Sequence, residues 1–377
     1  MPWKESSSMS SRLEFVALAR APGANIRALC RAFDVSPKTA YKWLARFDAH
    51  GQDGLQAQSR RPQSSPARTD PQREAQVLAL HALYPCWGSR KLRALLPPQD
   101  QLHPSTIDAI LRRNGRQIQG AADRTRIACK RFEHEAPNLL WQMDFKGHFA
   151  LTDARAGRCH ALTILDDHSR YSLCLQACGD ETGATVQRAL IATFRRYGLP
   201  QRITADNGSP WGIRAGQGLS RLEAWMMRLG IHVNHSRPYH PQTQGKDERF
   251  HRTLKLELLD RSGFNSLPAC QAAFDVWRER YNLIRPHEAL GQKPPVSRYQ
   301  ASGRLYPEQL PEVDYAPDDY VLKVRPKGQV TFRGHLVFIG EGVAGEHVAI
   351  RPTEVDGVFA AYFCHRRIRT FDLRPTE

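Results

Sequence analysis

The chain has 377 residues, enough for several domains that each have a core. Its 54 Lys and Arg residues outnumber 38 Asp and Glu residues, and the net charge of +16 favours nucleic acid as the partner. A basic surface that only keeps the chain in solution is the alternative. We find no apolar run as long as a membrane span and no signal-like apolar start, so we expect a cytoplasmic protein without a membrane partner. The eight cysteines include no CxxC pair, which predicts reduced, packed thiols rather than zinc ligands.

Residues 1–58 are predicted to form a helix-turn-helix domain. The segment IRALCRAFDVSPKTAYKWLARF contains two helical stretches around a sharp break, and Ser36 with Pro37 is typical of a helix start. Asp34 occupies the turn position where many such motifs carry Gly, so a plain helical hairpin is the alternative. The second helix would present an outward face to the DNA major groove. The residues of this face are Lys38, Thr39, Tyr41 and Lys42.

Three further segments precede the central part of the chain. Residues 59–71 are rich in Ser, Arg and Pro and are predicted to be a flexible basic linker. Residues 72–119 contain three short helical stretches with basic side chains, among them Arg112 and Arg113, and predict a second helix-turn-helix domain. Residues 120–138 are polar and basic, which is typical of a connector that crosses a DNA backbone.

The central part, residues 139–300, alternates strand and helix patterns and predicts an α/β domain. From Leu139 to Ala150 the pattern places Trp141 and Met143 on a buried face and Asp144 on the opposite one. Strands at 160–167 and 171–177, a helix at 182–197 and a strand at 201–208 follow. Asp206 comes at the carboxyl end of that last strand, where open sheets gather ligands.

A third acidic position lies in the segment HPQTQGKDERFHRTLK, which is predicted to be a helix. At about 100° per residue, Asp247 falls in the middle of the apolar face set by Phe250 and Leu254. Glu248 falls on the other face, beside Arg252 and Lys255, two cations suited to DNA phosphates. We therefore take Glu248 as the functional residue and keep Asp247 as the minor alternative.

Asp144, Asp206 and Glu248 together predict a metal site, although 62 and 42 residues separate them in sequence. Carboxylates brought together repel one another unless a cation neutralises them, and hard oxygen ligands select Mg²⁺ or Mn²⁺. Two such ions about 3.5–4 Å apart support cleavage or exchange of phosphodiesters without a covalent enzyme intermediate. Asp166 and Asp167 are better interpreted as turn residues. Tyr239 and Tyr281 lack the Arg and His partners of a tyrosine-type recombinase.

Residues 312–377 change to short alternating strands punctuated by Gly, which predicts a small β-barrel. Its many Lys and Arg residues make this domain basic. It resembles the small C-terminal barrel of integrases, and this resemblance implies nonspecific DNA binding. A dimerisation module is the alternative for this domain.

The motifs WQMDF, LDDHSRY, ADNG, HPQTQGKDERFHRTLK and YNLIRPHEALGQKPPVSRY resemble those of bacterial insertion-sequence transposases with a retroviral-integrase-type (DDE) core. The resemblance runs nearly end to end and implies an RNase H-like fold for the core. It assigns metal binding to Asp144, Asp206 and Glu248, and DNA contacts to Gln244 and Lys255.

The resemblance also implies a reaction. Such an enzyme binds the terminal inverted repeats of its mobile element, frees 3′-hydroxyls there and joins them to target DNA. Because two ends must be held together, we expect a homodimer or a larger oligomer on DNA. Two other functions stay open: a DNA-binding regulator or relic with an inert core, and a structure-selective nuclease that cuts DNA but never joins it.

Overall fold

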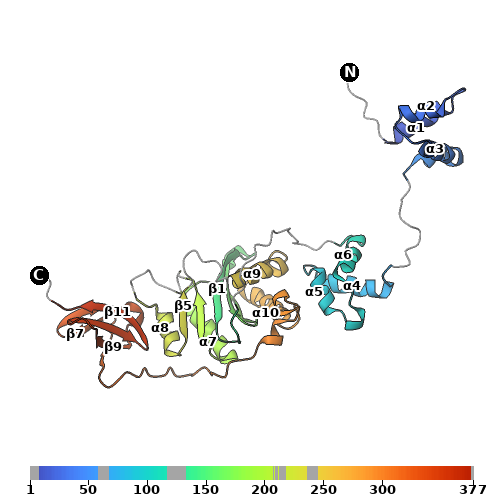
Figure 1. Cartoon of the computed structure of the whole chain (residues 1–377). Helices are drawn as coiled ribbons and strands as arrows, with labels where there is room; N and C mark the ends of the chain where they lie inside the picture. The colour runs from blue at the N-terminus through green and yellow to red at the C-terminus, as the bar shows by residue number, and fades with distance from the viewer. Residues whose placement is uncertain are drawn as a thin grey trace. The chain divides into compact units, whose positions relative to one another are not determined.

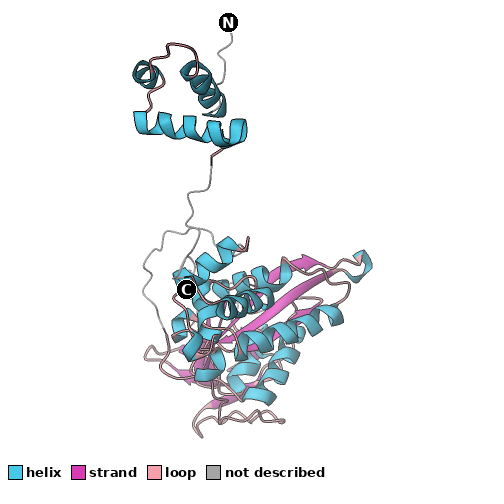
Figure 2. Ribbon diagram, turned by 90° about the vertical axis from the view of Figure 1, so that its right-hand side faces the viewer, coloured by secondary structure: helices cyan, strands magenta, loops and turns pink. Residues whose placement is uncertain are grey.

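The structure is a computed structural model that describes residues 8–57, 68–116, 133–206, 208, 211, 218–235 and 245–374. The chain divides into two compact units, Met1–Thr69 and Asp70–Glu377. Helices fill the first unit, whereas the second combines helices with sheets (Figure 1, Figure 2). Most of the expected linker and of the expected connector lies outside the described residues. No helix in the described ranges is both long and apolar enough to cross a membrane.

The first unit is a three-helix domain whose turn follows the sequence prediction. Ser36 caps the third helix, because its Oγ accepts a hydrogen bond from the Thr39 N–H at 3.2 Å. Asp34 adopts φ +50°, the left-handed turn conformation that favours Gly and that Asp also tolerates. Around this turn the helices bury a small apolar core. The elements are α1 (Ser8–Ala19), α2 (Ile26–Ala32), α3 (Pro37–His50) and a 3₁₀ turn (Gly51–Leu55).

The second unit begins with another small helical domain. Trp87, Leu92 and Ile107 form the centre of its core and are almost completely buried. Glu74 of the first helix holds the guanidinium of Arg113 in the third through two hydrogen bonds, of 2.9 and 2.7 Å. The helices are α4 (Pro71–Leu83), α5 (Ser89–Leu95) and α6 (Pro104–Arg113).

A five-stranded mixed sheet in the order β3-β2-β1-β4-β5 forms the centre of the second unit. The first three strands in sequence pair antiparallel, and β4 and β5 join them in parallel beside β1. This arrangement confirms the α/β, RNase H-like core that the sequence resemblance implied. The strands are β1 (Trp141–Ala150), β2 (Arg158–Asp166), β3 (Ser172–Cys178), β4 (Arg202–Ala205) and β5 (His232–His235).

Helices cover both faces of this sheet. Trp141 and Met143 of β1 pack in one core with residues of α7 and α8, while the other face packs against α9 and α10. Because both faces are covered, Gln142 is only 3% exposed, although the alternation had placed it opposite the buried side. All described cysteines are free and most are buried, as expected for packing thiols. The helices are α7 (Gly183–Tyr197), α8 (Arg221–Arg228), α9 (Gly245–Leu254) and α10 (Leu267–Leu283).

Helix α9 continues into a single π-helical turn, Lys255–Leu259, which carries the buried carboxylate of Glu257. This carboxylate accepts hydrogen bonds from the indole N–H of Trp87 at 3.1 Å and of Trp277 at 3.2 Å. It also accepts one from Nε of Arg285 at 2.8 Å, and both charged side chains are only 8% exposed. Trp87 precedes α5 and Trp277 lies in α10, so Glu257 joins the second helical domain to the core.

The C-terminal domain has the predicted strands, but the predicted small β-barrel is not confirmed. Its strands form an open four-stranded sheet, β11-β10-β9-β6, and a separate hairpin of β7 and β8. The domain packs on the core through Leu219, Ala224 and Met227. The strands are β6 (Tyr320–Lys323), β7 (Gln329–Phe332), β8 (His335–Phe338), β9 (His347–Pro352), β10 (Val358–Phe363) and β11 (Arg366–Asp372).

Replacing the buried carboxylate of Glu257 with an amide should destabilise the protein. The Glu257→Gln change leaves the Arg285 charge buried without its partner, which costs about 3–5 kcal/mol of unfolding free energy. Glu308→Gln is the matched control, because its two-bond pair with Arg195 is exposed to screening solvent and should matter little. Denaturant unfolding of both variants tests this; equal losses would show that the Glu257 contacts contribute no more than a surface pair.

A methyl group at position 342 should disturb the packing of the C-terminal domain on the core. A Cβ added to Gly342 would lie 1.7 Å from the carbonyl oxygen of Leu219, so the backbone must move. We expect Gly342→Ala to cost about 1–3 kcal/mol, as other overpacked sites do. Gly303→Ala is the control, since nothing lies within 4 Å of the position that its added methyl group would occupy. Thermal unfolding measures the difference. Equal losses of unfolding temperature in the two variants would contradict this close approach.

Candidate active site

Asp144 lies on β1 with its side chain partly exposed, beside other acidic groups. Burial first, and then the negative charges of Asp206, Glu181 and Glu248, raise its pKa to about 7. Nδ1 of His251 lies 3.9 Å from the Asp144 carboxylate. Burial lowers the pKa of this His to about 4, so its ring is neutral near pH 7 and does not compensate the acid. Asp144 therefore lies among negative charges that no nearby cation offsets in the described part of the chain.

Asp206 immediately follows β4, whose last residue is Ala205, and its side chain shapes the start of the next loop. Its Oδ1 accepts the backbone N–H of Gly208 at 2.8 Å. Its backbone carbonyl accepts from Nδ1 of His235 at 2.9 Å, while Nε2 of the same ring lies 2.8 Å from Glu223. Because both ring nitrogens face acceptors, the hydrogen bond to Glu223 raises the pKa of His235. The Glu223–His235 pair thus holds the backbone at Asp206.

Helix α9 separates Glu248 from Asp247 as the helical period predicted. Glu248 is exposed, as are Arg252 and Lys255, whereas Asp247 is only 1% exposed. Burial and the charges of nearby acids, Asp144 first, raise the pKa of Asp247 well above its usual range. One of its oxygens is buried and has no hydrogen-bond partner among the described residues. Asp247 is therefore a packed acid whose charged form is disfavoured, and Glu248 is the carboxylate available to a ligand.

Two contacts fix α9 against the sheet. Lys246, in its first turn, binds the carboxylate of Asp167, which follows β2. His251 contacts the Thr163 hydroxyl at 2.8 Å, and that hydroxyl donates to the backbone carbonyl of Asp144 at 3.0 Å. The helix that carries Glu248 is thus held to the strand that carries Asp144.

The acidic pair at the end of β2 has the structural role that we predicted. Asp166 accepts the N–H and hydroxyl of Ser169 at 2.7 and 2.5 Å, which closes the turn. Asp167 is also buried and accepts hydrogen bonds from Gln142 and His134. Burial acts to raise the pKa of Asp167, but the hydrogen bonds from Lys246 and His134, together with the charge of Lys246, outweigh it and lower the pKa. Neither side chain is available to a metal ion.

The predicted DNA-contact residues differ in their surroundings. Lys38, Tyr41 and Lys42 of α3 are exposed, whereas Thr39 is partly buried and its hydroxyl lies 2.9 Å from the Ser36 hydroxyl. In α6, Arg112 is exposed, whereas the guanidinium of Arg113 is engaged by Glu74. The remaining predicted contact, Gln244, lies outside the described residues.

The donor set fits a hard divalent cation. Asp144, Asp206 and Glu248 supply only carboxylate oxygens, and their mutual repulsion, expressed in the raised pKa of Asp144, is what such a cation relieves. Among the described residues, no three His, Cys, Asp or Glu side chains are assembled closely enough to hold a metal ion. The acids are therefore gathered in one region without being in ligand geometry.

Sequence reasoning missed the residues that support these acids. Thr163 and Lys246 position α9, and Glu223 with His235 positions the Asp206 loop. Thr163 lies in an apolar strand pattern, where a buried hydroxyl has no distinctive signal. The Glu223 carboxylate also caps α8 through Ser220 in a reciprocal pair, and the Ser-x-x-Glu spacing was a visible signal for that cap.

Models of known families match most of the chain. Integrase core domain models match residues 134–241 and 229–295. A helix-turn-helix domain model matches residues 11–63, and a homeodomain-like model matches residues 39–111. The C-terminal domain model of the IS481 family of transposases matches residues 319–377. Both helical domains, the core and the C-terminal domain thus each have a counterpart in a known family.

Two curated relatives come from bacterial insertion elements. The chain is 35% identical over 162 residues to the uncharacterized 39.2 kDa protein of insertion element IS476 from Xanthomonas euvesicatoria; the match covers 42% of this chain and 44% of that protein. It is 27% identical over 222 residues to the uncharacterized 31.7 kDa protein of IS407 from Burkholderia multivorans, covering 58% of this chain and 76% of that protein. The chain thus spans less than half of the first relative.

Among solved structures, one chain of the simian T-cell lymphotropic virus intasome, in complex with PP2A regulatory subunit B56 gamma, is 18% identical with a TM-score of 0.38. That match covers 79% of this chain and all of the other. The HTLV-2 integrase catalytic core domain in complex with magnesium is 17% identical with a TM-score of 0.34, covering 44% of this chain and 99% of the other. At these TM-scores the fold assignment depends on the sheet order and the family models. The chain thus carries an integrase-type core and is similar to bacterial insertion-sequence transposases.

Proposed function

We propose that this protein is a DNA transposase that binds the terminal inverted repeats of its own element, frees a 3′-hydroxyl at each end and joins it to target DNA. The observation that carries the proposal is that Asp206 and Glu248 lie near enough to Asp144 for their negative charges to help raise its pKa. These acids come from β1, from the end of β4 and from α9, so the fold gathers them from distant parts of the sequence. Such a cluster is unfavourable in the absence of a cation.

Asp144, Asp206 and Glu248 would hold Mg²⁺ or Mn²⁺, two ions in our proposal. Bound there, the ions would supply Lewis-acid activation of the attacking oxygen and charge stabilisation for the leaving one. The protein's own part is positional. Lys246 and Thr163 hold the helix of Glu248 to the sheet, and the Glu223–His235 pair holds the backbone at Asp206.

DNA recognition falls to the basic parts around the core. The two helix-turn-helix domains would read the element end, with Lys38, Tyr41, Lys42 and Arg112 as exposed contacts. Arg252 and Lys255 lie on the exposed face of α9 beside Glu248, where they would contact phosphates near the reacting bond. A homodimer or larger oligomer would bring two ends together in the cytoplasm, where the nucleoid lies.

Cleavage and joining of the element's own terminal repeats test the function. With Mg²⁺ or Mn²⁺, the wild-type protein should cut labelled end DNA and join it to a target. Glu248→Gln should abolish both steps and keep end binding, because it removes a metal ligand and leaves the DNA-reading domains intact. Asp247→Asn, the matched neighbour, should retain both steps, since a neutral acid and an amide are nearly isosteric.

The alternatives give different results in this assay. A protein that binds ends but never cuts them is a regulator or relic with an inert core. One that cuts without joining is a structure-selective nuclease. Loss of activity in Asp247→Asn alone would move the third ligand from Glu248 to its neighbour.

A metal-free stability measurement tests the acid cluster independently of DNA. The folded pKa of Asp144 is about 7, against an ordinary value of 3.8, so its contribution to folding stability is intact below pH 3.8 and is lost as pH rises towards 7. Asp144→Asn removes this loss, and with EDTA at pH 8 it should be more stable than wild type, by up to about 4 kcal/mol. Thermal unfolding of both proteins measures the difference.

The gain should shrink towards pH 4, where the wild-type acid is largely protonated in the folded state and half-protonated in the unfolded one. Added Mn²⁺ should raise the unfolding temperature of the wild type and leave Asp144→Asn nearly unchanged. A pH-independent difference between the two proteins would contradict the charge cluster.

A further inference from the structure

A basic cavity of about 260 Å³ lies between the second helical domain and the core, both within the second unit. Arg90 and Lys91 of α5 line one side, and Arg249 of α9 together with the segment after α10 lines the other. From that segment come Arg285, His287 and Glu288. Trp87 precedes Arg90 and Lys91 in sequence, and Glu257 follows Arg249. The hydrogen bond from Trp87 to Glu257 therefore holds the two walls of the cavity together.

Positive charge exceeds negative charge in this cavity. Glu288 is shared between Arg90 and Arg249 at 3.5 Å each, a long distance for an ion pair. Arg285 is paired with Glu257, which is not part of the lining. Burial, helped by the arginines, lowers the pKa of His287 to about 2, so this ring carries no charge. Two arginines and a lysine therefore face one partly exposed carboxylate.

Lys91 is the least compensated group. No ion pair or hydrogen bond of its ammonium is found among the described residues. Burial, followed by the positive charges of Arg285 and Arg249, lowers the pKa of Lys91 to about 8, although Glu257 and Glu288 act in the opposite direction. An anion bound in the cavity would supply the negative charge that the protein lacks there, and would stabilise the charged form of Lys91.

The lining selects a phosphate over a nucleobase. In the part of the chain that the structure describes, His287 provides the only ring of the lining, and it already packs against Tyr281. No other aromatic side chain of the described lining is there to stack on a base. Gln292, also in the lining, has a buried amide oxygen without a partner among the described residues, and a reversed amide would present N–H groups instead.

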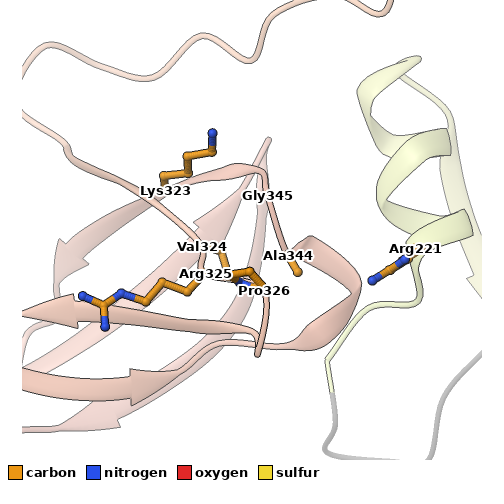
Figure 3. A pocket seen from close by; sticks show the side chains of 7 residues that line it. All are labelled: Arg221, Lys323, Val324, Arg325, Pro326, Ala344 and Gly345. Atoms are coloured by element: carbon orange, nitrogen blue, oxygen red, sulfur yellow. The ribbon is translucent and has the colours of Figure 1, made fainter.

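A larger basic cavity, of about 560 Å³, lies between α8 and the C-terminal domain and is a weaker candidate. Figure 3 shows that its basic side chains do not converge: Lys323 and Arg325 extend in different directions, and Arg221 approaches from α8. Convergent donors are what a phosphate requires.

We propose that the cavity around Lys91, here called the phosphate pocket, binds one backbone phosphate of duplex DNA. This inference rests on the proposed DNA-processing function, and it adds a contact that joins α5 to α9. Arg249 directly follows Glu248, so a phosphate bound here fixes the DNA backbone to the helix of the third acid. Glu288 is the internal anion that the phosphate displaces from Arg90 and Arg249.

Binding of labelled duplexes by the full chain, followed by fluorescence anisotropy over a series of KCl concentrations, tests the pocket. One duplex carries the terminal repeat and the other an unrelated sequence, because a phosphate contact serves both. Lys91→Gln should lower affinity for both about tenfold, the effect of one charge-assisted hydrogen bond, and should reduce the salt slope by about 0.9. Lys91→Arg should keep most of the affinity.

Arg93→Gln is the matched control, since it removes the same charge from an exposed position of the same helix outside the pocket. It should bind nearly as well as wild type. Glu288→Gln should bind DNA more tightly, because it removes the competing anion. Equal losses in Lys91→Gln and Arg93→Gln, or weaker binding by Glu288→Gln, would overturn the proposal.

Chemical labelling of the wild-type protein avoids any variant that fails to fold. Lys91 should react with acetic anhydride near pH 8 faster than exposed lysines, since its pKa is about 8, and either duplex should suppress the reaction. Unchanged labelling with bound DNA would overturn the pocket. Both measurements use EDTA and need no cleavage, so a protein that never cuts ends but shows Lys91 protection would refute the transposase function and keep the pocket.

Discussion

The arrangement of the second unit depends on the hydrogen bonds that the buried carboxylate of Glu257 accepts. Removing a carboxylate from water costs several kcal/mol, and here two indole N–H groups and one guanidinium offset that cost. The donors come from Trp87, Trp277 and Arg285, which belong to different parts of the unit. Because the acceptor lies in the π-helical turn after α9, the same contact ties the end of the helix of Glu248 to the second helical domain.

The acidic residues of the core divide into two physical classes. Asp166, Asp167 and Glu223 are buried, and each accepts several hydrogen bonds, so they stabilise turns and helix starts. Asp144 instead has like charges around it and no close cation among the described residues, which is a destabilising environment for an ionised acid. The acids of the first class are satisfied within the protein, whereas the uncompensated environment of Asp144 is typical of an acid that serves a ligand. This contrast supports Asp144 as part of a ligand site more strongly than its position in a motif does.

Asp247 shows why a neighbouring acid does not become an equivalent ligand. Helical geometry turns it about 100° away from Glu248, into the apolar face that packs on the sheet. Its pKa rises well above the usual range through burial, which disfavours the charged form that a metal ligand needs. In the proposed phosphate pocket the uncompensated charge is positive, because its lining holds more cations than carboxylates. The missing partner there is an anion. Both sites follow the same rule, that uncompensated charge at a concave or clustered position marks a place for a ligand.

The sequence by itself determined the elements and the choice among adjacent residues. The first four strands of the core and the helices α7 and α9 followed from the hydrophobic pattern, whereas α8, β5 and α10 were not predicted. The cap at Ser36 followed from a local dipeptide, and the helical period distinguished Glu248 from Asp247. These are short-range properties, set by backbone geometry and by which face a side chain occupies. Only the tertiary structure decided the rest: the burial of Gln142 under a second layer of helices, the open C-terminal sheet in place of a barrel, and the engagement of Arg113 by Glu74. The Trp87–Glu257 contact joins residues 170 positions apart, and no periodic pattern encodes such a pair because its energy exists only once both partners leave water together.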